Sequence, residues 1–457
     1  MKKILLVLAV FILSSGVAMA GNMDTYGIGA KATSLGGAYS AYANDPYAAY
    51  YNPAGLTQIK RPTISMGIAI LDPNLNIDNY TVKNSMAIPN PGPTNMSDTS
   101  PTLAAPSGGF AMPISDKLSA GIAMYAPFGL HLEWQKYNVD NPGTYNAYEA
   151  WIGRLAVTPT IAYKINNKLS IGFGFSLGRS KAGQKYQNLK LSIGGAKAAA
   201  ALGLPAGNYP VYADVNLKDD FNYSYNIGIM FKPVENLSFG LTYRSRTSAS
   251  YSGDVTFTGT GVTALATLNQ ATGGAAGMDL THSYDATLDD VDFPDQVQFG
   301  VRYLPLKTLS LETDIVWTHW NIVEHQTLII PGLGTDFLPR NWENTVQFRF
   351  GAEWLVNKIF SLRAGYYYDP TPIPDSTFDI PWPDGDKHSF SMGFGLNLTK
   401  HWTVDGLVQY IKSAQDREIN GESTNLNHSY NLGQSPTVDM QASGSILSYG
   451  LTVSYAF

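Results

Sequence analysis

The amino-acid sequence predicts an all-β protein: a 14-stranded antiparallel transmembrane β-barrel with an N-terminal hatch, or plug, inside the lumen. Three features carry this prediction. The N-terminus resembles an export signal, large apolar residues alternate with small or polar ones along many segments, and short turns alternate with long loops along the chain.

Residues 1–20 have the properties of a secretory signal peptide. Lys2 and Lys3 give a positively charged start, Ile4–Leu13 is an unbroken apolar run, and Ala18–Ala20 forms an A-x-A cleavage site. A bilayer-spanning helix needs about 20 apolar residues, so this run is too short to be one. We expect cleavage after Ala20; a retained N-terminal anchor is the alternative.

The composition favours a membrane barrel over a large soluble protein. Only 14% of the residues are charged, against about 25% in typical soluble domains, whereas the chain contains 44 Gly, 28 Tyr and 8 Trp. A soluble protein of this length needs many charges to cover its surface. A barrel with lipid outside and water inside needs few charges, many small residues and many interfacial aromatics.

Charge, cysteine count and motifs exclude several functions. Without the two signal-peptide lysines the chain has 28 basic and 36 acidic residues, a net charge of −8, which argues against nucleic acid as a partner. The absence of cysteine excludes disulfides and thiol catalysis. No common catalytic, nucleotide-binding or metal-binding motif occurs, so we expect no enzyme, no cofactor and no metal site.

The C-terminal segment shows the strand pattern most clearly. Large apolar residues from Tyr449 to Phe457 alternate with small or polar residues from Ser448 to Ala456, and the same pattern recurs over 169–178 and 389–398. Because side chains of a strand point alternately to its two faces, each such strand has one apolar and one small, polar face. The second face carries Gly and Ser rather than Lys and Glu, which is unusual for a soluble sheet.

Turns and loops give the number of strands. Six short turns, near 115–117, 166–168, 233–236, 305–307, 357–358 and 399–400, alternate strictly with seven long polar stretches, near 72–103, 131–149, 182–218, 259–280, 331–340, 370–385 and 419–443. Thirteen connections join fourteen strands and leave both chain ends on the side of the short turns. An even number of strands with short turns on one rim and long loops on the other is typical of bacterial outer-membrane barrels.

The segment 21–61 precedes the first predicted strand, Pro62–Leu71, and lacks its alternation. Fourteen strands enclose a lumen wider than the filled core of an eight-stranded barrel and narrower than the channel of a 16- to 18-stranded one. A compact segment rich in Gly, Ala and Tyr would close such a lumen. We therefore assign 21–61 to a hatch and 62–457 to the barrel; a disordered periplasmic tail is the alternative.

The sequence also resembles a known family. Gly36–Ala38, Asn44–Pro46 and the motif Asn52-Pro53-Ala54-Gly55-Leu56 resemble the hatch of the FadL family of long-chain fatty-acid transporters, with TodX-like aromatic-hydrocarbon channels as relatives. The segments 348–354, 363–366 and 369–375 agree with it. The resemblance spans the mature chain and implies a 14-stranded barrel plugged by its N-terminus.

Basic residues are candidates for contact with a substrate carboxylate. Family resemblance implies such a residue near the loop 182–218, where Lys181 matches best and Arg179 is close. The family's second cation, expected near Thr327, is missing. Arg349 and Arg363 occupy the same alternate positions of their strands as the small residues, so their side chains are predicted to point into the lumen. For each cation, an ordinary solvated charge is the alternative.

Further features concern the path of a hydrophobic substrate. The Ala-rich run 196–204 has helix propensity and, with Leu328–Ile330, is a candidate for the extracellular groove that the family forms from two loops; packing on the rim is the alternative. Pro127 and Gly129 lie in the third strand, where a proline opens a gap in the ladder or ends the strand. In the family this strand is kinked and opens the barrel sideways.

We therefore expect an outer-membrane channel for passive uptake of hydrophobic molecules, with long-chain fatty acids as the first candidate substrate. Its partners would be these small molecules and outer-membrane lipids, and we expect a monomer. An aromatic-hydrocarbon channel of the same fold, or a structural or adhesive barrel whose loops carry the function, are the alternatives.

Overall fold

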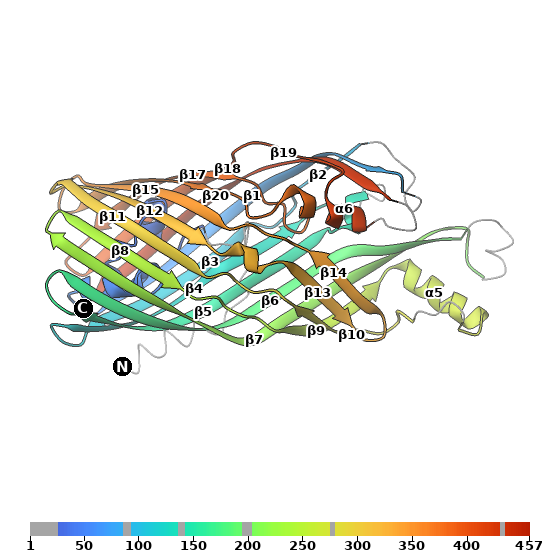
Figure 1. Cartoon of the computed structure of the whole chain (residues 1–457), viewed down its shortest axis with the longest axis horizontal. Helices are drawn as coiled ribbons and strands as arrows, with labels where there is room; N and C mark the ends of the chain where they lie inside the picture. Colours follow the sequence, from blue (N-terminus) through green and yellow to red (C-terminus); the bar gives the residue numbers. More distant parts are fainter. Residues whose placement is uncertain (1–25, 86–92, 136–141, 194–202, 275–278, 430–434) are drawn as a thin grey trace.

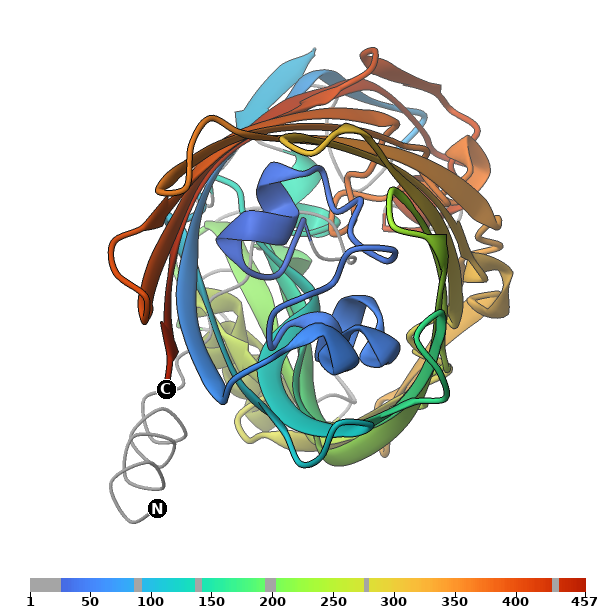
Figure 2. The ribbon, with the colours of Figure 1, turned by 90° about the vertical axis from the view of Figure 1, so that its left-hand side faces the viewer.

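The computed structural model describes residues 26–85, 93–135, 142–193, 203–274, 279–429 and 435–457. Fourteen strands form a closed antiparallel barrel, which confirms the fold predicted from the sequence (Figures 1 and 2). They are β1 (Thr63–Lys83), β3 (Leu103–Pro113), β4 (Leu118–Glu133), β5 (Glu149–Lys164), β6 (Leu169–Ile193), β7 (Gly207–Val234), β8 (Leu237–Arg244), β11 (Gln296–Leu306), β12 (Leu309–Thr318), β15 (Thr345–Leu355), β16 (Phe360–Asp369), β17 (Lys387–Asn397), β18 (Trp402–Ser413) and β20 (Thr437–Ala456).

Pairing between the first and last strands closes the barrel. β1 pairs with β20 from Thr63↔Ala456 to Lys83↔Thr437, and β1 pairs with β3 on its other side. Closure gives almost every strand a hydrogen-bonding neighbour on both sides, which a bilayer demands because it offers no water to unpaired peptide groups. The short turns lie together at one end of the barrel, where the C-terminus also lies (Figure 1). Among the described residues, no helix is long and apolar enough to cross a bilayer.

The two faces of the strands are sorted as the alternation predicts. On β6, Phe173 and Phe175 point outward and are 44% and 39% exposed. Ser176, the residue after Phe175, points inward and is buried. The same division holds on β7, where Ile227 is exposed and Asn226 is buried. An exposed apolar belt around a buried polar interior is the reverse of a soluble protein, and it fits lipid outside and a polar lumen inside.

Several strands continue well beyond the membrane belt, so the predicted loop boundaries were wrong at these places. The first strand was expected to end at Leu71 but runs to Lys83, and β6 and β7 extend through most of the predicted loop 182–218. Above the membrane a strand no longer faces lipid, so its outward side becomes polar and the apolar alternation disappears although the ladder continues. The predicted helix over 196–204 lies, except for its last two residues, outside the described residues.

Smaller elements cap the end opposite the short turns. The short strands extend the barrel wall or form hairpins above it, and two helices stand among them (Figure 1). These elements are β2 (Thr94–Ser97), β9 (Tyr251–Thr258), β10 (Tyr284–Asp289), β13 (His325–Ile330), β14 (Gly334–Pro339), β19 (Arg417–Asn420), α5 (Thr260–Ala271), α6 (Thr424–His428), η2 (Pro142–Tyr145), η3 (Trp320–Ile322) and η4 (Asp375–Thr377).

The described N-terminal segment from Tyr26 to Arg61 fills the lumen near the short turns. Figure 2 shows it, in dark blue, inside the ring of strands. Its elements are the helices α2 (Ala30–Ser34) and α3 (Ala48–Tyr51) and the 3-10 helix η1 (Pro53–Gln58), and nearly all of its residues are buried. We call this segment the hatch.

The small inner face of the barrel makes room for the hatch. A Cβ atom on Gly172 or Gly228 would overlap Pro53 or Asn52, and one on Gly365 would overlap the backbone at Gly36. Glycine at these inward positions therefore lets the hatch backbone approach the wall closely. This explains why the second face of the strands carries Gly and Ser.

Candidate functional site

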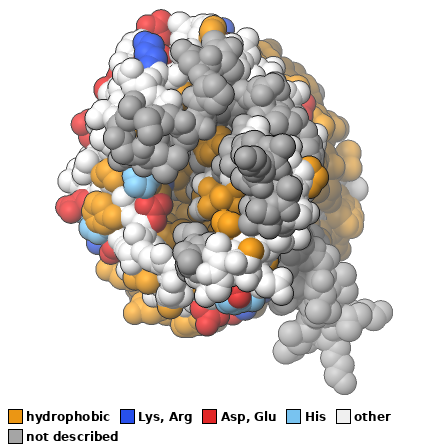
Figure 3. All heavy atoms as spheres, turned by 90° about the vertical axis from the view of Figure 1, so that its right-hand side faces the viewer, with side chains coloured by type: hydrophobic (Ala, Val, Ile, Leu, Met, Phe, Trp, Pro, Cys, Tyr) orange, Lys and Arg blue, Asp and Glu red, His pale blue; other side chains and the backbone are white. Residues whose placement is uncertain are grey.

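A cavity of about 270 Å³ lies among the extracellular loops above the barrel. Its wall combines apolar side chains such as Ile152, Leu328 and Leu338 with a few polar ones, and β6 contributes Ala182 and Gly183 to it. Figure 3 shows this end of the molecule, with hydrophobic side chains at the bottom of a hollow between the loops. We call this space the extracellular cavity.

Arg340 and Asp379 form a buried ion pair in the wall of the extracellular cavity. Their side chains are 2% and 5% exposed, and Nη1 of Arg340 lies 2.5 Å from Oδ2 of Asp379. Arg340 also donates from Nε to Gln326, at 2.9 Å. Burial raises the pKa of Asp379, and the guanidinium of Arg340 opposes that rise. Because Asp379 compensates it, the Arg340 cation is a weak attractor for an anionic ligand.

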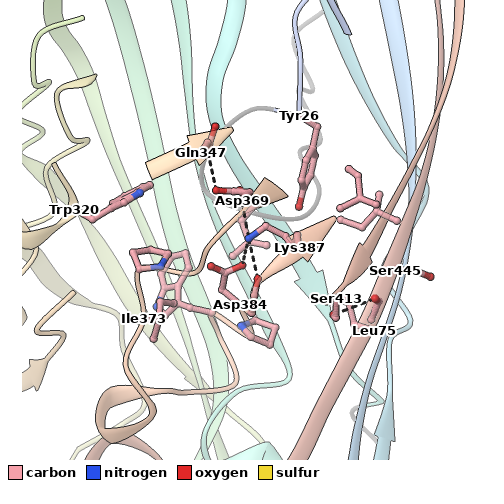
Figure 4. A pocket seen from close by; sticks show the side chains of 18 of the residues that line it. Tyr26, Leu75, Trp320, Gln347, Asp369, Ile373, Asp384, Lys387, Ser413 and Ser445 are labelled. Atoms are coloured by element: carbon pink, nitrogen blue, oxygen red, sulfur yellow. Dashed lines mark hydrogen bonds and ion pairs between the residues drawn. The ribbon is translucent and has the colours of Figure 1, made fainter. Parts of the chain in front are cut away.

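A second cavity, of about 70 Å³, lies deeper, between the loops and the hatch. Figure 4 shows Lys387 pointing into it between two carboxylates, with Nζ 2.7 Å from Asp384 and 3.5 Å from Asp369. Gln347 donates to the other oxygen of Asp369, at 2.7 Å. Here too the cation is compensated by acids in the same wall. We call this space the central cavity.

Aromatic side chains line the central cavity. Trp320, Trp342 and Trp382 contribute to its wall, and the rings of Trp320 and Trp342 pack edge to face with centroids 5.3 Å apart. The indole Nε1 atoms of Trp342 and Trp382 are buried and have no hydrogen-bond partner within the described part of the chain. The cavity wall therefore presents large apolar aromatic surfaces.

Shared or adjacent lining residues show that the cavities lie next to one another. Trp382 lines both the extracellular and the central cavity. Tyr26 of the hatch lines the central cavity, and the next residue, Gly27, lines a third space at the barrel wall. This third space, the wall cavity, also borders Ala105 on β3 and Tyr125 on β4.

The wall cavity lies where the ladder between β3 and β4 is interrupted. These strands pair from Pro113↔Ser119 as far as Gly108↔Met124, and the next bridge between the two chain segments is Asp98↔Trp134. Between these two bridges both segments are described, and no register pairing joins them. The β3–β4 ladder is therefore interrupted between these two bridges, and we call this interruption the gap.

Pro127 is associated with this gap but does not end its strand. A register shift between Tyr125 and Phe128 marks a β-bulge, after which β4 continues, paired with β5, to Glu133. Gly129 lies in this continued part, opposite Gly153. Pro106 stands on β3 at the opposite side of the gap. Proline has no backbone N–H. A proline at an unpaired strand edge therefore removes a donor that would otherwise lack a hydrogen-bond partner.

The motif Asn52–Leu56 fastens the hatch to itself and to the wall. Asn52 accepts from the backbone N–H of Ala54 at 3.1 Å, and its Nδ2 donates to the carbonyl oxygens of Ser40 at 2.7 Å and Ile229 at 3.0 Å. Pro53 begins η1, where a missing N–H costs nothing. Gly55 is packed so tightly against Ala43 that a Cβ would overlap it, and Leu56 is fully buried.

Two carboxylates of β12, which were not predicted from the sequence, hold the hatch. Oδ2 of Asp314 accepts from the backbone N–H groups of Tyr39 and Ser40, at 3.3 and 3.1 Å, and Glu312 accepts from Ala41 at 2.7 Å. The alternation of residues along β12 places both acids on the inner face of the barrel, and this can be predicted from the sequence. Their partners lie more than 270 residues away, which the sequence does not reveal.

Arg349 and Arg363 lie on the inner face and have partners there. Arg363 is 2.7 Å from Glu353 and 2.6 Å from Asp405, and Arg349 hydrogen-bonds Gln347 beside the hatch. Tyr42 of the hatch donates to Glu353 at 2.8 Å, so this network also fixes the plug. That either arginine contacts a substrate carboxylate stays a prediction, and these partners compete for the same guanidinium groups.

Arg179 and Lys181 lie on the outward face of β6. Both are exposed, while Ser180 between them is buried, and Nη2 of Arg179 is 3.3 Å from Asp220. The structure therefore brings neither residue into the extracellular cavity, whose wall contains their neighbour Ala182 instead. Arg179 and Lys181 lie on the same face of β6 as the exposed Phe175, and the alternation in the sequence already indicates this face.

A closed 14-stranded barrel with an apolar belt, a plugged lumen and a series of partly apolar cavities defines the class of outer-membrane channels for hydrophobic compounds. The family model of the outer membrane protein transport proteins (OMPP1/FadL/TodX) matches residues 7–457. The chain belongs to this family of outer-membrane transporters, which are not enzymes.

Individual relatives agree with the family. The chain is 24% identical to the long-chain fatty acid transport protein of Escherichia coli (strain K12) over 455 residues, covering 93% of each protein. Among solved structures it is similar to a FadL homologue of Pseudomonas aeruginosa, with a TM-score of 0.76, 21% identity and coverage of 97% and 100%. The toluene transporter TbuX of Ralstonia pickettii gives a TM-score of 0.65 at 16% identity, with coverage of 94% and 98%.

Proposed function

We propose that this protein takes up long-chain fatty acids by passive diffusion through the outer membrane. The single observation that supports this route is the succession of three neighbouring cavities, of which two share Trp382 and two are lined by the adjacent residues Tyr26 and Gly27. A hydrophobic molecule would collect in the extracellular cavity, descend to the central cavity and meet the hatch, which blocks the straight path to the periplasm.

The gap between β3 and β4 is the proposed exit. The wall cavity borders both the inward-facing Ala105 and the outward-facing Ile68, which is 46% exposed on the lipid side. A fatty acid leaving here would enter the bilayer without crossing the polar interior around the hatch. Transfer of each CH₂ from water to an apolar environment contributes about 0.8 kcal/mol, so a route within apolar surroundings favours long chains.

The choice of fatty acids as substrate is supported by several relatives at 23–24% identity that are named long-chain fatty acid transport proteins. Uptake of monoaromatic hydrocarbons is a second candidate, favoured by a specific observation. The central cavity is lined by three tryptophans, and its cation Lys387 is compensated by Asp384 and Asp369. Such a wall suits an uncharged aromatic molecule.

An uptake experiment with a matched pair of variants tests the proposal. Ala105 faces the wall cavity, whereas its neighbour Ala104 lies on the opposite face of β3. In Escherichia coli cells that lack their own transport protein of this family, wild type and Ala104→Phe should support uptake of radiolabelled oleic acid. Ala105→Phe should fill the exit and abolish uptake.

The outcomes separate the parts of the proposal. Uptake of radiolabelled toluene but not of oleic acid by the wild type would favour the second candidate function, uptake of hydrocarbons. Uptake of neither compound would contradict a transport role and favour a structural or adhesive barrel. Equal uptake by both Phe variants would remove the gap from the route.

A further inference from the structure

A small cavity of about 30 Å³ lies behind the bulge of β4, between the upper surface of the hatch and the barrel wall. Tyr50 of the hatch and Phe128 of the bulge line it, and so does Tyr125, which also lines the wall cavity. Tyr125 therefore borders both spaces. A cavity of this size accommodates a head group rather than a whole hydrophobic ligand.

Arg154 of β5 lines this cavity with a guanidinium group that is only partly hydrogen-bonded. It lies opposite Phe128 in the ladder and is only 2% exposed. Its Nε donates to Asn222 at 2.7 Å, but Nη2 is buried and has no hydrogen-bond partner among the described residues. A buried guanidinium nitrogen without an acceptor is costly, so such an atom marks a place for a ligand or water.

The surroundings of Arg154 are built to hold it. A Cβ on Gly178 of β6 would lie 2.8 Å from Nε and 2.9 Å from Nη2, so glycine leaves the space that the guanidinium occupies. Asp219, the acid that influences Arg154 electrostatically, accepts hydrogen bonds from Asn222 and from the backbone of Phe221. Within the described part of the chain, Arg154 forms no ion pair with any carboxylate.

Arg244 of β8 supplies a second cation to the same cavity. Its guanidinium donates to the amide oxygens of Gln296 and Gln298, at 3.0 and 2.9 Å, and stacks on the ring of Tyr50 at 4.6 Å. All of these partners are neutral. The lining of the cavity otherwise contains hydroxyl, amide, aromatic and proline side chains and, in the part of the chain that the structure describes, no acid.

We propose that Arg154 and Arg244 form a binding site for the carboxylate of an amphipathic ligand at the exit, with its apolar tail reaching past Tyr125 into the wall cavity. Two cations without a compensating acid distinguish this site from the extracellular and central cavities, where Arg340 and Lys387 are paired. The inference rests on the proposed function and adds the position at which the channel recognises an acid. Guanidinium groups suit this task because they present parallel N–H donors to a carboxylate.

Binding measurements on the full chain in detergent test this site. Radiolabelled dodecanoate and 1-dodecanol share a chain length and differ in head group. Arg154→Gln should weaken dodecanoate binding about 10- to 100-fold, the range expected for a hydrogen bond to a charged group, and leave dodecanol binding unchanged. Arg154→Lys should retain much of the preference for the acid. Lys164→Gln, on the same strand near the short turns, is the matched control for charge and should change neither affinity.

Other outcomes would overturn the proposal. Equal weakening of acid and alcohol by Arg154→Gln would mean that Arg154 only supports the fold. Selective weakening of the acid by Lys181→Gln but not by Arg154→Gln would place the contact at the residue that the sequence favoured. Dodecyl phosphate that binds more tightly than dodecanoate and depends on Arg154 would identify a phosphate site instead. If wild type binds neither dodecanoate nor dodecanol, the proposed function itself fails.

Discussion

Nη1 of Arg340 lies 2.5 Å from Oδ2 of Asp379, and both side chains are almost fully buried beside the extracellular cavity. This pair cancels a charge that would otherwise attract fatty-acid carboxylates at the outer mouth of the channel. Cation and acid come from connections that are 39 residues apart, so only the folded loops bring them together.

We predict that Asp379→Asn strengthens the binding of dodecanoate relative to dodecanol, because it leaves Arg340 without its counter-ion. The same change should destabilise the loops, since breaking a buried ion pair by removing one partner costs about 3–5 kcal/mol. Titration of both ligands on variant and wild type measures the first effect. The double variant Arg340→Met/Asp379→Leu removes both charges and should abolish the gain; a gain that persists would contradict the role of Arg340.

The hatch should loosen when its two carboxylate acceptors are removed. Glu312→Ala combined with Asp314→Ala leaves three backbone N–H groups of the turn Tyr39–Ala41 without acceptors, at about 1–3 kcal/mol for each unsatisfied donor. Single-channel conductance in planar bilayers should rise toward that of a variant lacking residues 24–57. The exposed acid Asp254, changed to Ala, serves as control. Unchanged conductance in the double variant would show that other contacts suffice to keep the hatch closed.

The ion pairs of Arg363 should contribute far more stability than those of Arg179. Arg363 is 5% exposed and bridges Glu353 and Asp405, so Arg363→Met removes the ion-pair partner of two buried acids and should lower the free energy of unfolding by about 3–5 kcal/mol. Arg179 is 65% exposed in its pair with Asp220, and Arg179→Met should cost less than about 1 kcal/mol. Urea unfolding of both variants in detergent measures the difference, and similar costs would contradict it.

His428 should give the extracellular cavity a pH-dependent contact. Its Nε2 lies 3.0 Å from Oδ1 of Asp336, and this hydrogen bond raises the pKa of His428 above its ordinary value of 6.5. A raised folded pKa means that the contact is fully stabilising below pH 6.5 and is lost as the pH rises through the folded pKa. An NMR titration should find a pKa above 6.5 in the wild type, and Asp336→Asn should return it toward 6.5. A pKa that this substitution leaves unchanged would exclude Asp336 as the cause.

The sequence alone determined the barrel, the number of strands and the inward or outward face of most side chains. These properties follow from a period of two and from turn residues, which are local signals that lipid outside and a small-residue lumen impose on each strand separately. The inward positions of Arg349 and Arg363 could be predicted in this way. The same alternation places Lys181 outward and Arg154 inward, and neither position was predicted.

Only the tertiary structure decided which charges are compensated and where the ladder between β3 and β4 is interrupted. Asp379 neutralises Arg340, and Asp314 accepts from Ser40 across 274 residues, because the closed ladder and the packed loops bring distant segments together. The gap depends on the register between β3 and β4, which Pro127 suggests but does not specify. Register and loop packing are set by cooperative contacts around the whole barrel, so they leave no local signal to read.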